Sequence, residues 1–154
     1  MQEVKDKLNA ELKTLEHELR VELPKEIRTA VAMGDLSENA EYKAALERQA
    51  YVKARIAQLR ERLGAIASFN VQQVPADRVA IGSRVTLLDL DSDQEVTYEL
   101  VFPEVADLSR GLISIASPIG RSLVGLQDGD TVKVAIPSGT KRFEVLELRT
   151  IHDK

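Results

Sequence analysis

Apolar residues recur at intervals of three or four along two long stretches in the first half of the chain. The first stretch spans residues 4–31 and the second spans residues 38–66. This spacing gathers the apolar side chains on one face of an α-helix, and heptad repeats of this kind are typical of coiled coils. The repeating positions are Leu8, Leu12, Leu15, Leu19, Leu23, Ile27 and Ala30 or Val31 in the first stretch, and Tyr42, Ala45, Gln49, Val52, Ile56, Leu59, Leu63 and Ile66 in the second. The pattern predicts two long helices packed through a common seam.

The junction between the two helices is the run Gly34-Asp35-Leu36-Ser37-Glu38-Asn39-Ala40-Glu41-Tyr42. Gly34 suits a left-handed cap that ends the first helix. Asp35, with Glu38 three residues later, matches an N-cap and its capping box at the start of the second helix. Because so little chain separates the two helices, they must be antiparallel neighbours. We expect a helical hairpin with an acidic tip over residues 34–42.

Folding the chain back at this tip predicts which residues face one another across the hairpin. The expected seam pairs are Leu8 with Ile66, Leu15 with Leu59, and Leu19 with Ile56, and the expected ion pairs are Glu11 with Arg62 and Glu18 with Arg55. The next step places Lys25 opposite Arg48, two like charges. Together with Arg28 and Lys43, these cations predict a basic patch behind the acidic tip, although a solvated charged face explains the same residues.

The first helix has one irregularity. The seam spacing is four, three and four up to Leu19, and then four and four through Leu23 to Ile27. Successive fours are a stutter in the heptad, and Pro24 lies at this point. We expect a kink or a short break near Pro24, with two separate helices as the alternative.

Helical periodicity is lost over residues 68–82, which contain Pro75 and Gly82. We place a domain boundary here, giving domains 1–74 and 75–154. Strand patterns follow at residues 85–90, 95–102, 112–115, 131–136 and 142–148, with a short helix after Ser117 and Pro118 that stops at Gly125. The second domain is therefore expected to be compact and α+β, with a twisted antiparallel sheet.

Composition excludes several kinds of chemistry. The 154 residues include no Cys and only two His, His17 and His152, far apart in the sequence, which argues against thiol catalysis, histidine triads and Cys or His zinc cages. No apolar run is long enough for a membrane span, so the default location is the cytoplasm. The net charge of −4 falls entirely in residues 77–154, which makes the second domain a poor general binder of nucleic acid.

The tip carboxylates allow two interpretations. Asp35, Glu38 and Glu41 recur every three residues. Acidic residues at a helix start are stabilised by the helix dipole, and capping alone accounts for them. Carboxylates this close can also share a hard cation such as Mg²⁺. An ion at an exposed tip would need further ligands from another molecule, which a projecting rod could reach.

The tip run resembles the signature of bacterial Gre transcript-cleavage factors of the GreA type. The similarity extends to Asp89-Leu90-Asp91-Ser92-Asp93, to Leu112-Ile113-Ser114, and to the segment 117–125, in the same order as in that family. The resemblance covers nearly the whole chain. It implies a coiled-coil hairpin that enters the secondary channel of bacterial RNA polymerase, followed by an FKBP-like domain that docks on the polymerase.

The resemblance also implies a function and roles for individual residues. The factor is expected to act as a monomer without enzymatic activity of its own, stimulating the polymerase to cleave backtracked RNA, with no tightly bound cofactor but with Mg²⁺ shared with the polymerase site. Asp35 would stabilise that metal and Glu38 would orient the attacking water, supported by Asn39, Glu41 and Tyr42. Lys25, Arg28, Lys43 and Arg48 would contact the nascent RNA 3′ end. Asp91, Asp93, Ser117, Pro118, Ile119 and Arg121 would dock on polymerase, with turn and cap roles as the alternative.

Two points of this resemblance bear on function. Leu46 stands where relatives often carry a basic residue, so RNA contact could be weaker or shifted to Arg48. A Gre-like inhibitor that blocks the channel without stimulating cleavage is the main competing function. Such inhibitors tend to depart from the acidic tip pattern, which this chain keeps.

Overall fold

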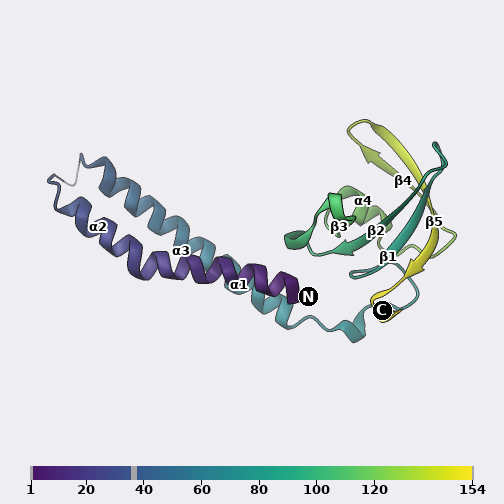
Figure 1. Ribbon diagram of the computed structural model, residues 1–154, viewed down its shortest axis with the longest axis horizontal. Coiled ribbons are helices and arrows are strands. Elements are labelled where there is room, and N and C mark those ends of the chain that lie inside the picture. The colour runs from purple at the N-terminus through teal and green to yellow at the C-terminus, as the bar shows by residue number, and fades with distance from the viewer. Residues whose placement is uncertain (1, 36–37, 154) are drawn as a thin grey trace. The chain divides into compact units, whose positions relative to one another are not determined.

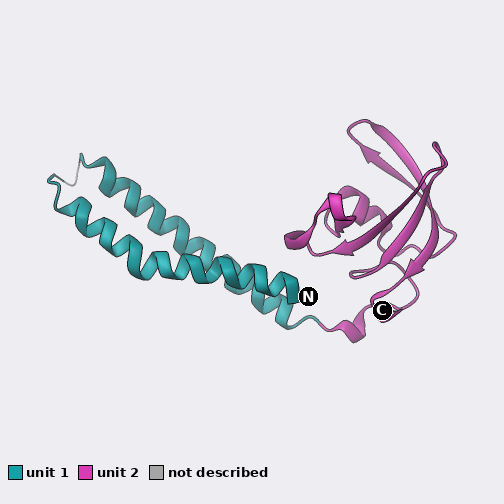
Figure 2. Ribbon diagram, viewed as in Figure 1, with its two compact units in different colours: residues 1–69 teal, residues 70–154 magenta. Residues whose placement is uncertain are grey.

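A computed structural model describes residues 2–35 and 38–153 of the chain. Leu36 and Ser37, within the tip run, lie outside the described residues. The chain divides into two compact units, residues 1–69 and 70–154 (Figure 2). The division falls inside the stretch where the sequence loses its helical periodicity.

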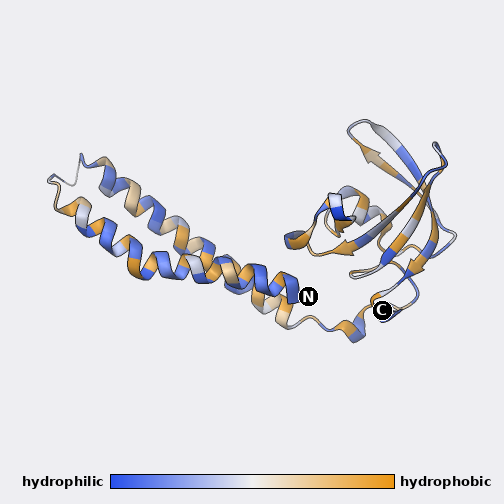
Figure 3. Cartoon of the chain, in the orientation of Figure 1, coloured by the Kyte–Doolittle hydropathy of each residue, from blue (hydrophilic) through white to orange (hydrophobic). Residues whose placement is uncertain are grey.

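The first unit is a helical hairpin (Figure 1). One arm consists of α1 (Gln2–His17), a π-helical segment η1 (Glu18–Glu22) and α2 (Leu23–Val31), and the other arm is α3 (Ala40–Ala67). Polar and apolar residues are interspersed along both arms (Figure 3). The buried residues are Val4, Leu8, Leu15, Leu23 and Ala30 on the first arm and Ala45, Val52, Ile56, Leu59 and Ile66 on the second. These are seam positions of the predicted heptads, apart from Val4 at the start of the first arm.

The first arm continues past Pro24 without a break, because a π-turn absorbs the irregularity of the heptad. The backbone N–H of Leu23 donates to Glu18 O, a bond that spans five residues instead of four. Pro24 follows directly after this turn, and its missing N–H removes one backbone hydrogen bond from an otherwise continuous helical arm. The extra residue of the stutter is taken up in this turn, and Leu23 and Ala30 beyond it are buried.

The ion pairs across the hairpin differ from those predicted. Glu11 binds Arg55 at 2.8 Å and Glu18 binds Arg48 at 2.7 Å, each one heptad away from the expected partner. Arg48, Arg55 and Arg62 are spaced by seven residues, so a shift of the pairing by one heptad still places an arginine opposite each glutamate. The charges alone therefore could not determine which arginine pairs with which glutamate. Leu19 and Ile56, an expected seam pair, do line the same groove.

The second unit is a five-stranded sheet with one short helix. Its elements are β1 (Arg84–Asp89), β2 (Glu95–Val101), β3 (Leu112–Ser114), α4 (Pro118–Leu123), β4 (Thr131–Ile136) and β5 (Gly139–Arg149), with short 3₁₀ turns at Val71–Gln73, Pro103–Val105, Leu108–Arg110 and Ile151–Asp153. The strand order is β3-β2-β1-β5-β4. The chain is mixed α+β, with a helical N-terminal unit and a curled five-stranded sheet.

One strand pairing contradicts the expected all-antiparallel sheet. β3 pairs with β2 in parallel, with Leu100 opposite Ile113, whereas the other three pairings are antiparallel. A parallel neighbour requires a crossover instead of a hairpin, and the segment of two 3₁₀ turns between β2 and β3 provides it. Sequence alternation shows which face of a strand is buried but not in which direction it runs.

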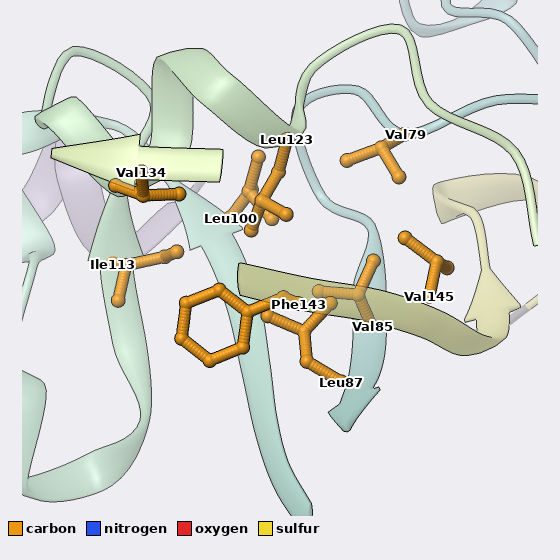
Figure 4. Packing of buried hydrophobic residues seen from close by; sticks show 9 residues of the cluster. All are labelled: Val79, Val85, Leu87, Leu100, Ile113, Leu123, Val134, Phe143 and Val145. Atoms are coloured by element: carbon orange, nitrogen blue, oxygen red, sulfur yellow. The ribbon is translucent and has the colours of Figure 1, made fainter. Parts of the chain in front are cut away.

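The core of the second unit lies between the sheet and α4. Figure 4 shows the buried side chains from the strands, from α4 and from the loop at Val79 gathered in one cluster. The whole cluster consists of Val79, Val85, Leu87, Leu100, Ile113, Leu123, Val134, Phe143 and Val145. Strand β1 contributes alternate residues to it, as expected for a strand with one buried face. None of the described helices is long and apolar enough to span a membrane.

Two glycines in helices predict opposite effects of the same substitution. A Cβ at Gly120 would overlap the carbonyl oxygen of Ser114, whereas a Cβ at Gly64 would meet nothing within 4 Å. We expect Gly120→Ala to lower the free energy of unfolding of the second unit by about 1–3 kcal/mol. Gly64→Ala should raise that of the hairpin by about 0.5–1 kcal/mol, because alanine favours helix. Guanidinium unfolding, followed unit by unit through amide NMR signals, measures both, and a neutral Gly120→Ala would contradict the packing described.

Candidate functional site

The tip carboxylates border one hollow at the end of the hairpin. This hollow has a volume of about 390 Å³ and is lined by Met33, Asp35, Glu38, Asn39, Ala40 and Glu41. The carboxylate residues Asp35, Glu38 and Glu41 are all exposed. The tip therefore presents acidic groups to solvent, where a second molecule can reach them.

Asn39 holds the tip together. Its Oδ1 accepts from the backbone N–H of Tyr42 at 3.0 Å, and its Nδ2 donates to the carbonyl of Ala30 at 2.7 Å. One amide thus caps the start of α3 and ties it to the end of α2. The predicted cap was wrong: α3 starts at Ala40 with Asn39 as N-cap, so Asp35 and Glu38 precede the helix and do not form its capping box. Asn39 satisfies two backbone groups at once, which Asp35 could not do from outside the helix.

Gly34 turns the chain after the first arm. The helix ends with Ala32 as C-cap, and Gly34 has φ of +124°, in the region that glycine adopts most readily. The positive φ expected of Gly34 is confirmed, but Gly34 is not the cap itself, because it lies two residues beyond the C-cap Ala32. The chain can therefore leave α2 sharply and return within eight residues to begin α3 at Ala40.

The carboxylates do not form a complete metal site. Among residues 2–35 and 38–153, no group of three or more His, Asp or Glu side chains could hold a metal ion. Protein sites for Mg²⁺ commonly use one or two carboxylates and take the remaining ligands from water or substrate. An ion at the tip would therefore need ligands beyond those that the described residues supply.

The predicted basic patch is only partly as expected. Lys25, Arg28 and Lys43 are exposed. Arg48 was predicted to lack an acidic partner, and this was wrong: Glu18 binds it through Nε at 2.7 Å and Nη2 at 2.9 Å. Its guanidinium also lies 5.0 Å from the centre of the Tyr51 ring. Arg48 is a fixed cation, whereas the other three are long exposed side chains.

The Glu18–Arg48 pair perturbs both groups. Hydrogen bonding to Arg48, opposed by partial desolvation, lowers the pKa of Glu18 below its usual value of 4.5. Hydrogen bonding to Glu18 raises the pKa of Arg48 further. Glu18 therefore stays ionised to lower pH than an isolated glutamate. Sequence reasoning assigned Glu18 to Arg55, and only the fold shows that it binds Arg48.

In the second unit, the predicted docking residues Asp91 and Asp93 lie on a structured turn. Asp91 binds Arg142 at 2.8 Å, and Asp93 has φ of +59°. Asp89 organises this turn, because its Oδ1 accepts from the backbone N–H groups of Asp91 and Ser92. Those bonds, led by the one from Asp91 and aided by Lys141, lower the pKa of Asp89. Asp91 thus has a structural partner within its own unit.

The other predicted docking residues belong to helix α4. Ser117 is its N-cap, accepting from the Gly120 N–H and donating to Ser114 O, and Pro118 occupies the first turn, both as predicted. Ile119 packs against the core, while Pro118 and Arg121 are exposed. The exposed part of this segment is therefore Pro118 with Arg121.

Comparison with known proteins identifies the family. Residues 2–67 match the family model "Transcription elongation factor, N-terminal" of GreA and GreB, and residues 74–150 match "Transcription elongation factor, GreA/GreB, C-term". The chain belongs to the GreA/GreB family of transcription elongation factors. The acidic tip lies in the part matched by the first model, and the Asp89–Asp93 turn and α4 lie in the part matched by the second.

Individual relatives are similar to this Gre-family chain over most of its length. The transcription elongation factor GreA of Desulfotalea psychrophila is 46% identical over 94% of this chain and 89% of its own. That of Acidiphilium cryptum is 43% identical over 92% and 90%. The solved structure of GreA factor homolog 1 (Gfh1) of Thermus thermophilus covers 96% of this chain and 93% of its own at 25% identity, with a TM-score of 0.44. The family assignment rests on the sequence matches.

The two bonds of Asn39 predict graded effects of substitution. Asn39→Ala removes both and should lower the free energy of unfolding of the hairpin by about 1–2 kcal/mol. Asn39→Asp keeps the cap but sets a carboxylate against the Ala30 carbonyl, so its loss should be smaller. Asn9→Ala, at an exposed position of α1, serves as control and should cause no loss. Thermal unfolding at 222 nm provides the measurement, and an Asn39→Asp variant as stable as the intact protein would refute a role for the bond to Ala30.

The Glu18–Arg48 pair predicts a specific pH dependence. Because the pKa of Glu18 is lower in the folded state, its contribution to stability is present above the unfolded value near 4.5 and is lost as pH falls through the folded value. In a carboxyl ¹³C titration, the Glu18 midpoint should lie below 4.5 and rise in Arg48→Gln. Arg60→Gln, which removes the partner of Glu16, is the matched control and should leave Glu18 unchanged. A Glu18 midpoint that ignores Arg48→Gln would show that the pair does not persist in solution.

Proposed function

We propose that this protein stimulates RNA polymerase to cleave backtracked nascent RNA and so rescues arrested transcription complexes. The observation that carries the proposal is the hollow at the tip, where a Gre-family chain presents Asp35, Glu38 and Glu41 to solvent around one space. These groups cannot complete a metal site alone. They are instead suited to complete the site of a partner, the polymerase.

Each tip residue then has a defined task. Asp35 would supply a carboxylate oxygen to the Mg²⁺ of the polymerase site, and Glu38 would accept a hydrogen bond from the attacking water and orient it. The metal supplies charge stabilisation to the phosphate that is cleaved. Asn39 is a positioning residue, because its bonds to Tyr42 and Ala30 fix the start of α3 next to these carboxylates. Glu41, in the first turn of α3, adds negative charge to the same hollow.

We also propose how the two units divide the work. The hairpin, an antiparallel coiled coil by its heptads, reaches through the secondary channel of the polymerase. The second unit has an FKBP-like fold and docks on the polymerase through Pro118, Arg121 and the Asp89–Asp93 turn. The factor acts as a monomer in the cytoplasm, and the catalytic site belongs to the polymerase.

The exposed cations near the tip serve the RNA. Lys25, Arg28 and Lys43 can neutralise phosphates of an extruded 3′ segment. Arg48 contributes less to phosphate binding than its charge suggests, because Glu18 already neutralises it. With Arg48 neutralised, electrostatic attraction to the RNA comes mainly from Lys25, Arg28 and Lys43, and it is expected to be weak.

Cleavage in stalled, backtracked complexes tests the proposal. The intact protein with Mg²⁺ should accelerate cleavage, and Asp35→Ala/Glu38→Ala should lose at least about 100-fold of that acceleration, as expected when charged groups acting in the transition state are removed. The double variant should still compete with intact protein for polymerase. Glu61→Ala, an exposed acid in the far half of α3, is the control and should behave as intact protein.

Three results would contradict the proposal. Binding of the intact protein that slows both elongation and cleavage would identify a channel inhibitor. Cleavage of RNA with Mg²⁺ in the absence of polymerase would identify a nuclease. Full activity of the double variant would remove the tip from the chemistry.

A further inference from the structure

A second hollow lies behind the tip, between the two arms of the hairpin. Its volume is about 600 Å³, and it is lined by residues of α2 and the following turn, from Lys25 to Met33, and by residues of α3 from Glu41 to Arg48. Met33 and Glu41 also line the hollow at the tip. The cleft therefore adjoins the proposed site of chemistry.

The cleft exists because small residues meet where the seam elsewhere has large ones. Ala30 and Ala45 are buried between the arms, and Ala44 lines the cleft from an exposed position. Deeper in the hairpin, the larger side chains of Leu23, Val52 and Leu59 are fully buried in the seam. Met33, a flexible side chain that is 64% exposed, lies at the end nearest the tip. The result is an open apolar floor that the hairpin does not fill itself.

The charges at the edge of the cleft are balanced. Lys25 and Arg48 are cations and Glu26 and Glu41 are anions. A bare phosphate would meet repulsion as well as attraction here, and an aliphatic group would leave the charged edge without partners. A flat group with apolar faces and with both donors and acceptors on its edge matches the lining, and a nucleobase has this chemistry.

Arg48 is arranged to take part in such recognition. Its Nε and Nη2 are bound to Glu18, and the Tyr51 ring lies under the guanidinium. The second terminal nitrogen, Nη1, carries further donors that these two bonds do not use. An arginine fixed in this way loses little side-chain freedom when it binds.

We propose that this cleft is a base-binding subsite that receives one unpaired base of the extruded RNA, and that it favours guanine. The inference rests on the proposed function and extends it to a sequence preference. Guanine offers O6 and N7 as acceptors to Arg48 or Lys25, and its N1–H and N2 amine as donors to Glu26 or Glu41. Adenine lacks the carbonyl oxygen and the donor pair of this edge, and pyrimidines cover less of the apolar floor.

The test compares backtracked complexes that differ in a single extruded nucleotide. Guanine, adenine, cytosine, uracil or an abasic ribose is placed at each of the extruded positions in turn. The quantity measured is the cleavage rate with the protein divided by the rate without it, which removes the intrinsic effect of the base. At one position, we expect guanine to exceed the abasic site by about five-fold or more, in keeping with one specific base contact.

Two variants assign the effect to the cleft. Ala44→Leu fills it from an exposed helical position and should abolish the difference among bases while leaving stimulation of the abasic complex intact. Ala54→Leu, at an exposed position of α3 outside the cleft, is the matched control and should retain the difference. Glu26→Gln should reduce the advantage of guanine over adenine, because it removes one acceptor. Circular dichroism verifies that each variant keeps its helices.

The outcomes separate this inference from the function on which it rests. Stimulation of cleavage that is the same for all bases and the abasic site would overturn the base-binding subsite and leave the proposed function standing. A base preference that survives Ala44→Leu would also overturn the assignment to this cleft. Loss of stimulation on every complex, with intact protein, would instead overturn the proposed function.

Discussion

The hairpin depends on keeping one apolar seam continuous from its base to its tip. The heptad contains one residue too many between Leu19 and Leu23, and in a regular helix every later apolar side chain would rotate out of the seam. The π-turn at Glu18–Glu22 absorbs that residue, so that Leu23 and Ala30 remain buried. Because the arms stay in register, Ala30 reaches Asn39, and the tip can be fastened at the far end of the unit.

At the tip, the residue that fixes the backbone differs from the residues proposed to act in the chemistry. Asn39 provides the bonds that fix the chain, whereas the nearby carboxylates stay exposed and are not used as the helix cap. A carboxylate that capped the helix would spend an oxygen on backbone N–H groups and would be less available to a metal or a water. Placing an amide at the cap resolves this competition. This arrangement supports the proposed function, in which the exposed carboxylates act in the active site of the polymerase.

Charge pairing shapes the surface behind the tip. Glu18 fixes Arg48 and cancels much of its charge, which leaves a cleft with balanced charge and a floor of alanines in place of a uniformly basic patch. In the second unit, Arg142 similarly restrains Asp91 on the acidic turn. In both units, the fold pairs within the chain a charged residue that the sequence analysis had assigned to binding another molecule. Fewer unpaired charges therefore remain on these surfaces than the sequence suggests.

The sequence by itself determined the two helical arms, the tip between them, most strands of the second unit and the family, because heptad spacing, strand alternation and the run at residues 34–42 are local signals. The tertiary structure alone decided the partner of Arg48, the parallel pairing of β3, and the role of Asn39. Heptads repeat every seven residues, so a shift by one heptad leaves the pattern unchanged, and alternation carries no strand direction. Asn39 bonds to a carbonyl nine residues away, a contact that exists only once both arms have packed.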